Sequence, residues 1–127
     1  MVADFRVAGP KAKFSANFVS LGIHAGFGIS YTLPMLIGRQ NASLMLLTGR
    51  RIKSDTAKEM GLVDILTSEE NLLKEAMKLA TEIASQAPLA VQATRKTLRK
   101  NLAEQIKSQT DYEWKVQQAL MQTEDFK

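Results

Sequence analysis

Apolar and polar residues follow two different patterns along the chain. In the first 14 residues they alternate over short stretches, which predicts two brief strands at about residues 5–7 and 12–14, separated by a turn at Gly9-Pro10. From about residue 30 onward, apolar residues recur every three or four positions, which is typical of amphipathic helices. Because two such brief strands do not form a stable sheet by themselves, we expect them to complete a larger one. The pattern therefore favours an α/β chain that is mostly α-helical.

Capping and helix-breaking residues divide the helical part into segments. We expect helices from residue 30, at 41–47, at 54–60, from Ser68, from Pro88 and at 103–122. Between the third and fourth of these helices we expect a short extended segment at 62–66. The helix from Ser68 carries a continuous apolar face: Leu72, Leu73, Ala76, Leu79, Ala80, Ile83 and Ala84. Such faces are more often core or subunit interface than ligand site.

The last expected helix has a thin apolar face, consisting of Ile106, Thr110, Trp114, Gln117 and Met121. The residues around this face are largely glutamines, polar but uncharged. Such a helix is suited to packing against another protein surface, so we expect it to take part in oligomerisation.

Residues 15–38 hold four of the seven glycines: Gly22, Gly26, Gly28 and Gly38. Glycine at this density predicts tight turns, or backbone that approaches a ligand closely. Glycines that lead into a helix also leave backbone N–H groups directed at whatever lies there. The glycine pattern by itself leaves both alternatives open, a tight turn and a close approach to a ligand.

Composition narrows the class of protein. The chain has 127 residues, close to the size of one domain, and its 45% hydrophobic residues are ordinary for a globular protein. No apolar run approaches the ~20 residues that span a bilayer, and the first residues lack the apolar stretch of a secretory signal. Without cysteine there is no disulfide, thiol nucleophile or zinc-thiolate site. We expect a cytoplasmic protein with no membrane partner and no metal.

The net charge of +4 raises the question of an anionic partner. Only Arg95, Lys96, Arg99 and Lys100 form a compact basic cluster, and at helical spacing they predict a solvated face with acids nearby in sequence. A small basic nucleic-acid-binding protein is therefore a weak hypothesis, and we expect no nucleic-acid partner. A nucleotide-bearing small molecule could use the same excess charge.

Several consecutive motifs together are more specific. They are residues 3–8 (ADFRVA), 12–14 (AKF), 21–28 (LGIHAGFG), 47–52 (LTGRRI), 60–64 (MGLVD), 87–90 (APLA) and 123–127 (TEDFK). In this order and spacing they resemble the enoyl-CoA hydratase/isomerase (crotonase) family, and the resemblance covers essentially the whole chain.

The resemblance implies the C-terminal part of a crotonase-type ββα spiral with the trimerisation helices. Residues 1–65 would be the end of the spiral core with the acyl-pocket segment, and residues 66–127 a helical oligomerisation region. Since family members are roughly twice as long, most of the spiral and the two N–H groups of the oxyanion hole are expected before Met1. The implied partners are acyl-CoA and further copies of the chain, as a trimer or dimer of trimers. CoA would enter as part of the substrate, in fatty acid metabolism, with no other cofactor.

The family's chemistry also shows what this chain lacks. Crotonase-type reactions pass through an enolate-like anion, and proton transfer then needs positioned carboxylates. The first carboxylate of the hydratases would lie before Met1. The second belongs to a Pro-Glu pair, where this chain has Asn17 and Phe18. Phenylalanine cannot accept a proton, so we assign no catalytic residue. The position of Asp4 in the family implies a structural role.

The resemblance assigns substrate contact more readily than catalysis. Asn17, Phe18, Leu21 and Gly26 match positions that line the acyl site in relatives. For Gly26 two alternatives stay open: a side chain would collide with substrate, or the residue is a plain turn glycine. His24 and Tyr31 are weaker candidates. The expected structural role of His24 is a hydrogen bond within the turn, and that of Tyr31 is packing in the first helical turn.

Two functional hypotheses follow from the sequence. In the first, the chain acts on or binds an acyl-CoA thioester as part of an enoyl-CoA hydratase/isomerase. In the second, it is a non-catalytic oligomerisation or binding module derived from the family. The absent second carboxylate, together with the oxyanion hole expected before Met1, favours the second hypothesis, and turnover of crotonyl-CoA would contradict it.

Overall fold

The strands pair with segments that lie far away in sequence. The computed structural model describes residues 3–127 and contains β1 (Val7–Ala8), β2 (Lys13–Phe14), β3 (Ile52–Lys53) and β4 (Ile65–Leu66). β1 pairs in parallel with β4, with Val7 opposite Ile65, and β2 pairs antiparallel with β3, with Lys13 opposite Lys53. The two early strands exist, although the first starts two residues later than predicted. The pattern did not predict β3.

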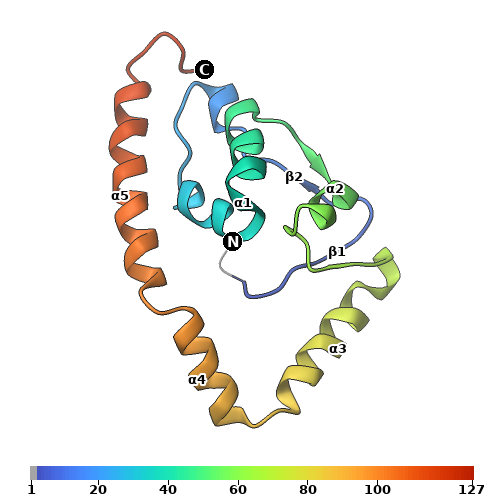
Figure 1. Ribbon diagram of the computed structural model, residues 1–127. Coiled ribbons are helices and arrows are strands. Elements are labelled where there is room, and N and C mark those ends of the chain that lie inside the picture. Colours follow the sequence, from blue (N-terminus) through green and yellow to red (C-terminus); the bar gives the residue numbers. More distant parts are fainter. Residues whose placement is uncertain (1–2) are drawn as a thin grey trace.

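The helices lie close to the predicted segments, except for a short 3₁₀ helix at residues 18–21 that the pattern did not predict (Figure 1). They are η1 (Phe18–Leu21), α1 (Ile29–Thr48), α2 (Ser54–Glu59), η2 (Glu69–Asn71), α3 (Leu72–Ala84), α4 (Pro88–Leu98) and α5 (Leu102–Leu120), where η marks a 3₁₀ helix. α1 is two helical pieces joined at Gly38, whose φ of 76° and ψ of 158° are not helical. This kink separates the two helices that the sequence predicts on either side of it.

The core lies where α1 and α2 meet the strands. Its largest fully buried apolar side chains are Leu33, Met45, Leu62 and Val63. Around them pack the buried Ala8, Ile37, Ala42, Ile52 and Ala57. These buried side chains come from early and late parts of residues 1–66. Their burial holds β1 against β4 and β2 against β3.

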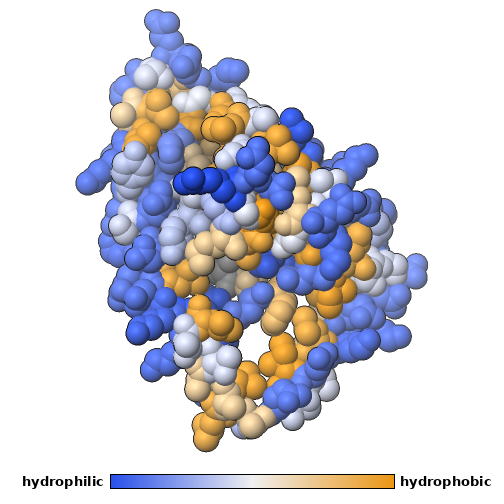
Figure 2. Space-filling model, in the orientation of Figure 1, coloured by the Kyte–Doolittle hydropathy of each residue, from blue (hydrophilic) through white to orange (hydrophobic). Residues whose placement is uncertain are grey.

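α3 and α4 extend away from this core (Figure 1). Neither helix contains a buried residue, and Leu73 on α3 and Leu98 on α4 are 75% and 80% exposed. Figure 2 shows apolar residues, in orange, along the facing sides of the two helices. Exposed apolar surface of this extent is unusual for a monomer. Among residues 3–127 no helix has the length and hydropathy to cross a bilayer.

Ion pairs connect the N-terminal segment to distant parts of the chain. Asp4 pairs with Arg95 at 2.8 Å and with Arg99 at 2.9 Å, and Arg6 pairs with Asp64 at 3.3 Å. The hydrogen bond from Arg95, followed by that from Arg99 and the charges of both, lowers the pKa of Asp4 below its ordinary value. The structural role expected of Asp4 is therefore visible. The solvated face predicted for the basic cluster is confirmed at Arg95, Lys96 and Lys100, which are exposed, while Asp4, the ion-pair partner of Arg95 and Arg99, lies more than 90 residues away.

Candidate functional site

Three of the four predicted acyl-site residues lie on one short turn. Phe18 and Leu21 are the first and last residues of η1, and Asn17 is its N-terminal cap residue. Asn17 and Leu21 are exposed, whereas Phe18 is half-buried. The turn ends at Gly22, whose left-handed φ of 70° and contact with the backbone of Asp125 both require glycine. The structure therefore brings these three candidates together, with Gly26 further along the chain.

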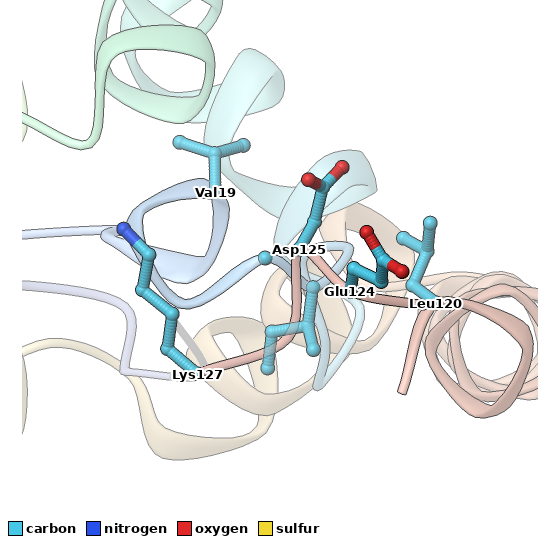
Figure 3. Close-up of a pocket in the computed structure, with 7 residues that line it drawn as sticks. Val19, Leu120, Glu124, Asp125 and Lys127 are labelled. Atoms are coloured by element: carbon cyan, nitrogen blue, oxygen red, sulfur yellow. The ribbon is translucent and has the colours of Figure 1, made fainter. Parts of the chain in front are cut away.

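A cavity of about 410 Å³ lies beside this turn (Figure 3). Val19, Gly22 and Ile23 line one side. The other side comes from the end of the chain: Leu120, Glu124, Asp125 and Lys127. The opening is wide, and Figure 3 shows charged side chains from the last residues around it. None of the predicted site residues lines this cavity, so it lies next to the η1 candidates without including them.

The weaker candidates His24 and Tyr31 contact residues of the same chain rather than the cavity. His24 Nδ1 lies 2.7 Å from the carbonyl oxygen of Ala25. Because a carbonyl can only accept, the hydrogen bond requires the tautomer with the proton on Nδ1. The ring of His24 also meets that of Tyr112 edge-on, with centroids 6.2 Å apart. Tyr31 is half-buried in the first turn of α1. The hydrogen bond predicted within the turn for His24 is confirmed.

A buried carboxylate caps the start of α1. Glu113, on α5, is 0% exposed. Its Oε2 accepts the N–H of Gly28 at 2.6 Å, and its Oε1 accepts both the N–H of Ser30 at 3.1 Å and the Ser30 hydroxyl at 2.5 Å. These N–H groups belong to the helix terminus where the glycine pattern predicted N–H groups directed outward from the helix start. At Gly28 and Ser30 these groups meet a carboxylate of the same chain.

Two glutamines of α5 extend this network by one turn in each direction. Gln109 donates to Ser30 Oγ at 2.9 Å, and Gln117 donates to the carbonyl of His24 at 2.7 Å. The same Gln117 amide explains why position 26 is a glycine, because a Cβ on Gly26 would lie only 2.7 Å from Gln117 Nε2. In the structure Gly26 is buried against α5.

The predicted packing face of α5 is confirmed at Ile106, Thr110 and Gln117 and is wrong at Trp114. The prediction placed Trp114 on the apolar face, but Trp114 is 53% exposed and its neighbour Glu113 is buried. The glutamine-rich surroundings were assigned to contacts with another protein, yet Gln109 and Gln117 bind residues 24–30 of the same chain. The reason is that the start of α1 presents backbone N–H groups without a partner in the helix, and the polar side chain of Glu113 on α5 accepts their hydrogen bonds.

Comparison with known proteins decides the family. The chain matches the profile of the family described as enoyl-CoA hydratase/isomerase over residues 1–127. The chain belongs to the enoyl-CoA hydratase/isomerase family. It is 38% identical over 111 residues to a short-chain-enoyl-CoA hydratase of Clostridioides difficile, covering 87% of this chain and 68% of that protein. To a short-chain-enoyl-CoA hydratase of Clostridium acetobutylicum it is 32% identical over 127 residues, covering all of this chain and 49% of that protein.

Solved structures of enoyl-CoA hydratase/isomerase proteins share the fold. An enoyl-CoA hydratase/isomerase from Pseudoalteromonas atlantica T6c superposes with a TM-score of 0.87 and 27% identity, over 97% of this chain and 50% of that one. An enoyl-CoA hydratase from Bacillus halodurans gives a TM-score of 0.84 and 32% identity, over 96% and 49%. The crotonase fold expected from the motifs is therefore confirmed. The chain spans about half the length of both structures.

Sequence reasoning missed Glu113, the polar side chain most deeply buried beside the glycine turn. A signal was present, since Gln109, Glu113 and Gln117 recur every four residues and so share one face of a helix. The apolar pattern concealed this row, because apolar residues are normally the ones assigned to a buried face. In residues 3–127 no three His, Cys, Asp or Glu side chains lie close enough together to hold a metal ion.

Proposed function

We propose that this chain binds an acyl-CoA thioester, with η1 and the glycine turn after it forming one wall of the acyl site. The observation that carries the proposal is the family match over the full 127 residues. The relatives' names support the substrate class, since they are short-chain-enoyl-CoA and crotonyl-CoA hydratases. Asn17, Phe18 and Leu21 are the proposed contact residues on η1, and Gly26 is the proposed contact residue of the following turn.

The proposal separates binding from hydration. Phe18, half-buried on η1, offers the acyl group an apolar surface and no proton acceptor. Adding water across the enoyl double bond requires a base for the water and an acid for the carbanion, each within hydrogen-bonding reach. With an aromatic ring at position 18, we expect this chain to bind enoyl-CoA and to leave it unhydrated. His24 and Tyr31 are proposed as neighbours of the site rather than as acids or bases.

The proposal also includes assembly. α3 and α4 expose apolar side chains along their length, including Leu73, Met77, Leu89 and Leu98. We propose that these faces pack against further copies of the chain, as a trimer or dimer of trimers, in the cytoplasm. In this proposal CoA enters only as part of the substrate. We propose that the chain takes part in fatty acid metabolism.

Titration with crotonyl-CoA tests the proposal. We expect saturable binding, with the enoyl absorbance decaying no faster than in buffer. Phe18→Ala removes the ring and should weaken binding by about fivefold, since its apolar contact is lost. The matched control is Leu47→Ala, which removes an exposed apolar side chain from the end of α1 and should leave the affinity unchanged. Equal weakening by both variants would contradict the proposed position of the site.

The second hypothesis, a non-catalytic oligomerisation module, is favoured by one observation. Helices α3 and α4 contain no buried residue although their sequences carry apolar faces. A module of this kind would self-associate and fail to bind crotonyl-CoA. The same titration, combined with a measurement of the oligomeric state, therefore distinguishes the two hypotheses.

A further inference from the structure

The turn between η1 and α1 contains strained backbone. Phe27 has a φ of +61° and Gly28 a φ of +67°, so two consecutive residues are left-handed. Phe27 is one of two non-glycine residues with positive φ in the part of the chain that the structure describes, and its side chain is 86% exposed. A phenylalanine in this conformation costs about 1 kcal/mol and persists only where its surroundings impose it.

The surroundings that impose it come from α5. Glu113 holds the turn from its C-terminal side through Gly28 and Ser30. Gln117, one helical turn further along α5, holds it from the N-terminal side through the carbonyl of His24. Gly26 lies between these two anchors, buried against Gln117. The path of the backbone at Gly26 is therefore fixed by hydrogen bonds from a helix about 90 residues further along the chain.

Glu113 is the stronger of the two anchors. Its side chain is fully buried, and its two oxygens accept two backbone N–H groups and one hydroxyl. Hydrogen bonds to an ionised carboxylate are shorter and stronger than neutral ones, and a buried carboxylate without them would be costly. Gln109 completes the arrangement, because its donation to Ser30 Oγ leaves the serine hydroxyl proton directed at Glu113.

We propose that Glu113 is a positioning residue for the acyl-thioester site: its buried carboxylate on α5 holds the strained turn 26–28 in the shape that binds the acyl group. This inference rests on the proposed function, because it concerns the same site. Glu113 touches no substrate in this account. It acts through Gly28 and Ser30, and it makes α5 a part of the binding site.

The experiment compares Glu113→Gln with two controls. The amide keeps the shape of the side chain but presents one NH₂ group to donors that need acceptors. The first control, Glu104→Gln, makes the same change at an exposed position in the first turn of α5. The second, Val63→Ala, removes a core side chain that is 1% exposed and lies outside the turn, so it destabilises the fold without touching the network. Crotonyl-CoA affinity is measured by titration, and amide exchange at Gly28 and Ser30 by NMR, at a temperature where all variants are folded.

The expected result is a Kd about five- to tenfold higher in Glu113→Gln, with faster exchange at Gly28 and Ser30, and wild-type Kd values in both controls. Binding by Glu113→Gln equal to wild type overturns the inference alone. Equal weakening by Val63→Ala also overturns it, because Glu113 would then act only through stability. A wild-type chain that does not bind overturns the proposed function and this inference with it. If Glu113→Gln fails to fold, Ser30→Ala, which removes the hydroxyl between Gln109 and Glu113, is judged by the same criteria.

Discussion

At the scale of single residues, Gly28 is fixed by two separate constraints. Its φ of +67° is unfavourable for any residue with a side chain, and a Cβ would lie 2.9 Å from Ile106 Cγ2 on α5. Gly28→Ala should therefore lower the free energy of unfolding by about 2 kcal/mol, from backbone strain and displacement of α5 together. Urea denaturation measures this loss.

The control for Gly28 is Gly61→Ala. Gly61 also has a positive φ, +81°, but the nearest atom to its Cβ would be the carbonyl oxygen of Leu36 at an ordinary 3.6 Å. It should lose only the backbone contribution, about 1 kcal/mol. Equal losses for the two variants would show that the contact with Ile106 carries no cost.

Gly26 allows the two interpretations of a glycine at this position to be separated. Without a positive φ, its backbone tolerates alanine, and the obstacle is the Gln117 amide at 2.7 Å. We expect Gly26→Ala to lower stability by about 1 kcal/mol, and Gln117→Ala in the same chain to relieve the clash, so the two changes are not additive. Unfolding of the two single variants and the double variant measures this coupling.

The affinity of the same Gly26 and Gln117 variants for crotonyl-CoA tests whether a side chain at position 26 also collides with the acyl group. If the glycine is needed only for packing against α5, the double variant should bind as tightly as Gln117→Ala alone, which lacks the same anchor. If a side chain at position 26 collides with the acyl group, the double variant should bind more weakly than Gln117→Ala alone.

Asp4 gives the fold a contribution to stability that depends on pH. Its pKa is lowered in the folded chain by Arg95 and then Arg99, so the folded state favours the ionised form. Such a group stabilises the fold above its unfolded pKa of about 3.9, and this contribution is lost as the pH falls through the lower folded value. Because Asp4 is partly exposed and water screens both pairs, Asp4→Asn should cost less than about 1 kcal/mol at pH 7.

Urea denaturation of wild type and Asp4→Asn at pH 7 and at pH 3 checks this prediction. The difference between the two proteins should be present at pH 7 and shrink at pH 3. A difference that is constant with pH would mean that Asp4 stabilises the fold through contacts other than its charge.

At this scale, sequence patterns predicted the turn glycines and the hydrogen bond of His24 but not the role of Glu113. Glycine and proline act locally, so their effect on φ can be inferred from neighbouring residues. Glu113 acts on residues 83 and 85 positions earlier. A contact over that distance depends on how α5 folds back, which no local pattern contains.

At the scale of elements, the sequence predicted the helices well and their contacts poorly. Gly49 and Pro88 mark boundaries that the structure confirms, because capping and breaking are local effects. The packing face of α5 includes the predicted Gln117, but Glu113 is buried there and its neighbour Trp114 is exposed. Apolar periodicity assumes that buried faces are apolar, and here the buried face satisfies the polar N-terminus of α1.

The exposed faces of α3 and α4 lead to a prediction about assembly. Leu73→Gln and Leu98→Gln replace side chains that are 75% and 80% exposed, so each should change the unfolding free energy of the isolated chain by less than about 0.5 kcal/mol. If these faces join copies of the chain, both variants should shift the association equilibrium toward the monomer. Sedimentation velocity across a concentration series measures this shift.

The matched control for this assembly experiment is Leu47→Gln, at the end of α1. Leu47 is also strongly exposed, 76%, but lies outside α3 and α4. Association that is unchanged in all three variants would contradict a role for α3 and α4 in assembly.

At the scale of the whole molecule, spaced motifs predicted the crotonase fold where apolar periodicity alone gave only an α/β class. The motifs preserve order across 127 residues, and the TM-score of 0.87 against an enoyl-CoA hydratase/isomerase confirms what they imply. The strand pairing could not be predicted, because two-residue strands carry almost no pattern. What joins β1 to β4 is the burial of side chains such as Leu62 and Val63 beside them.

We propose that this chain, which spans about half the length of the solved enoyl-CoA hydratase structures it matches, binds an acyl-CoA thioester through the η1 turn without hydrating it. The most direct measurement is a single titration of the purified 127-residue chain with crotonyl-CoA, recording binding and the enoyl absorbance together. We expect saturable binding that Phe18→Ala weakens, while the enoyl absorbance decays no faster than in buffer. Absence of binding, or hydration faster than in buffer, would contradict the proposal.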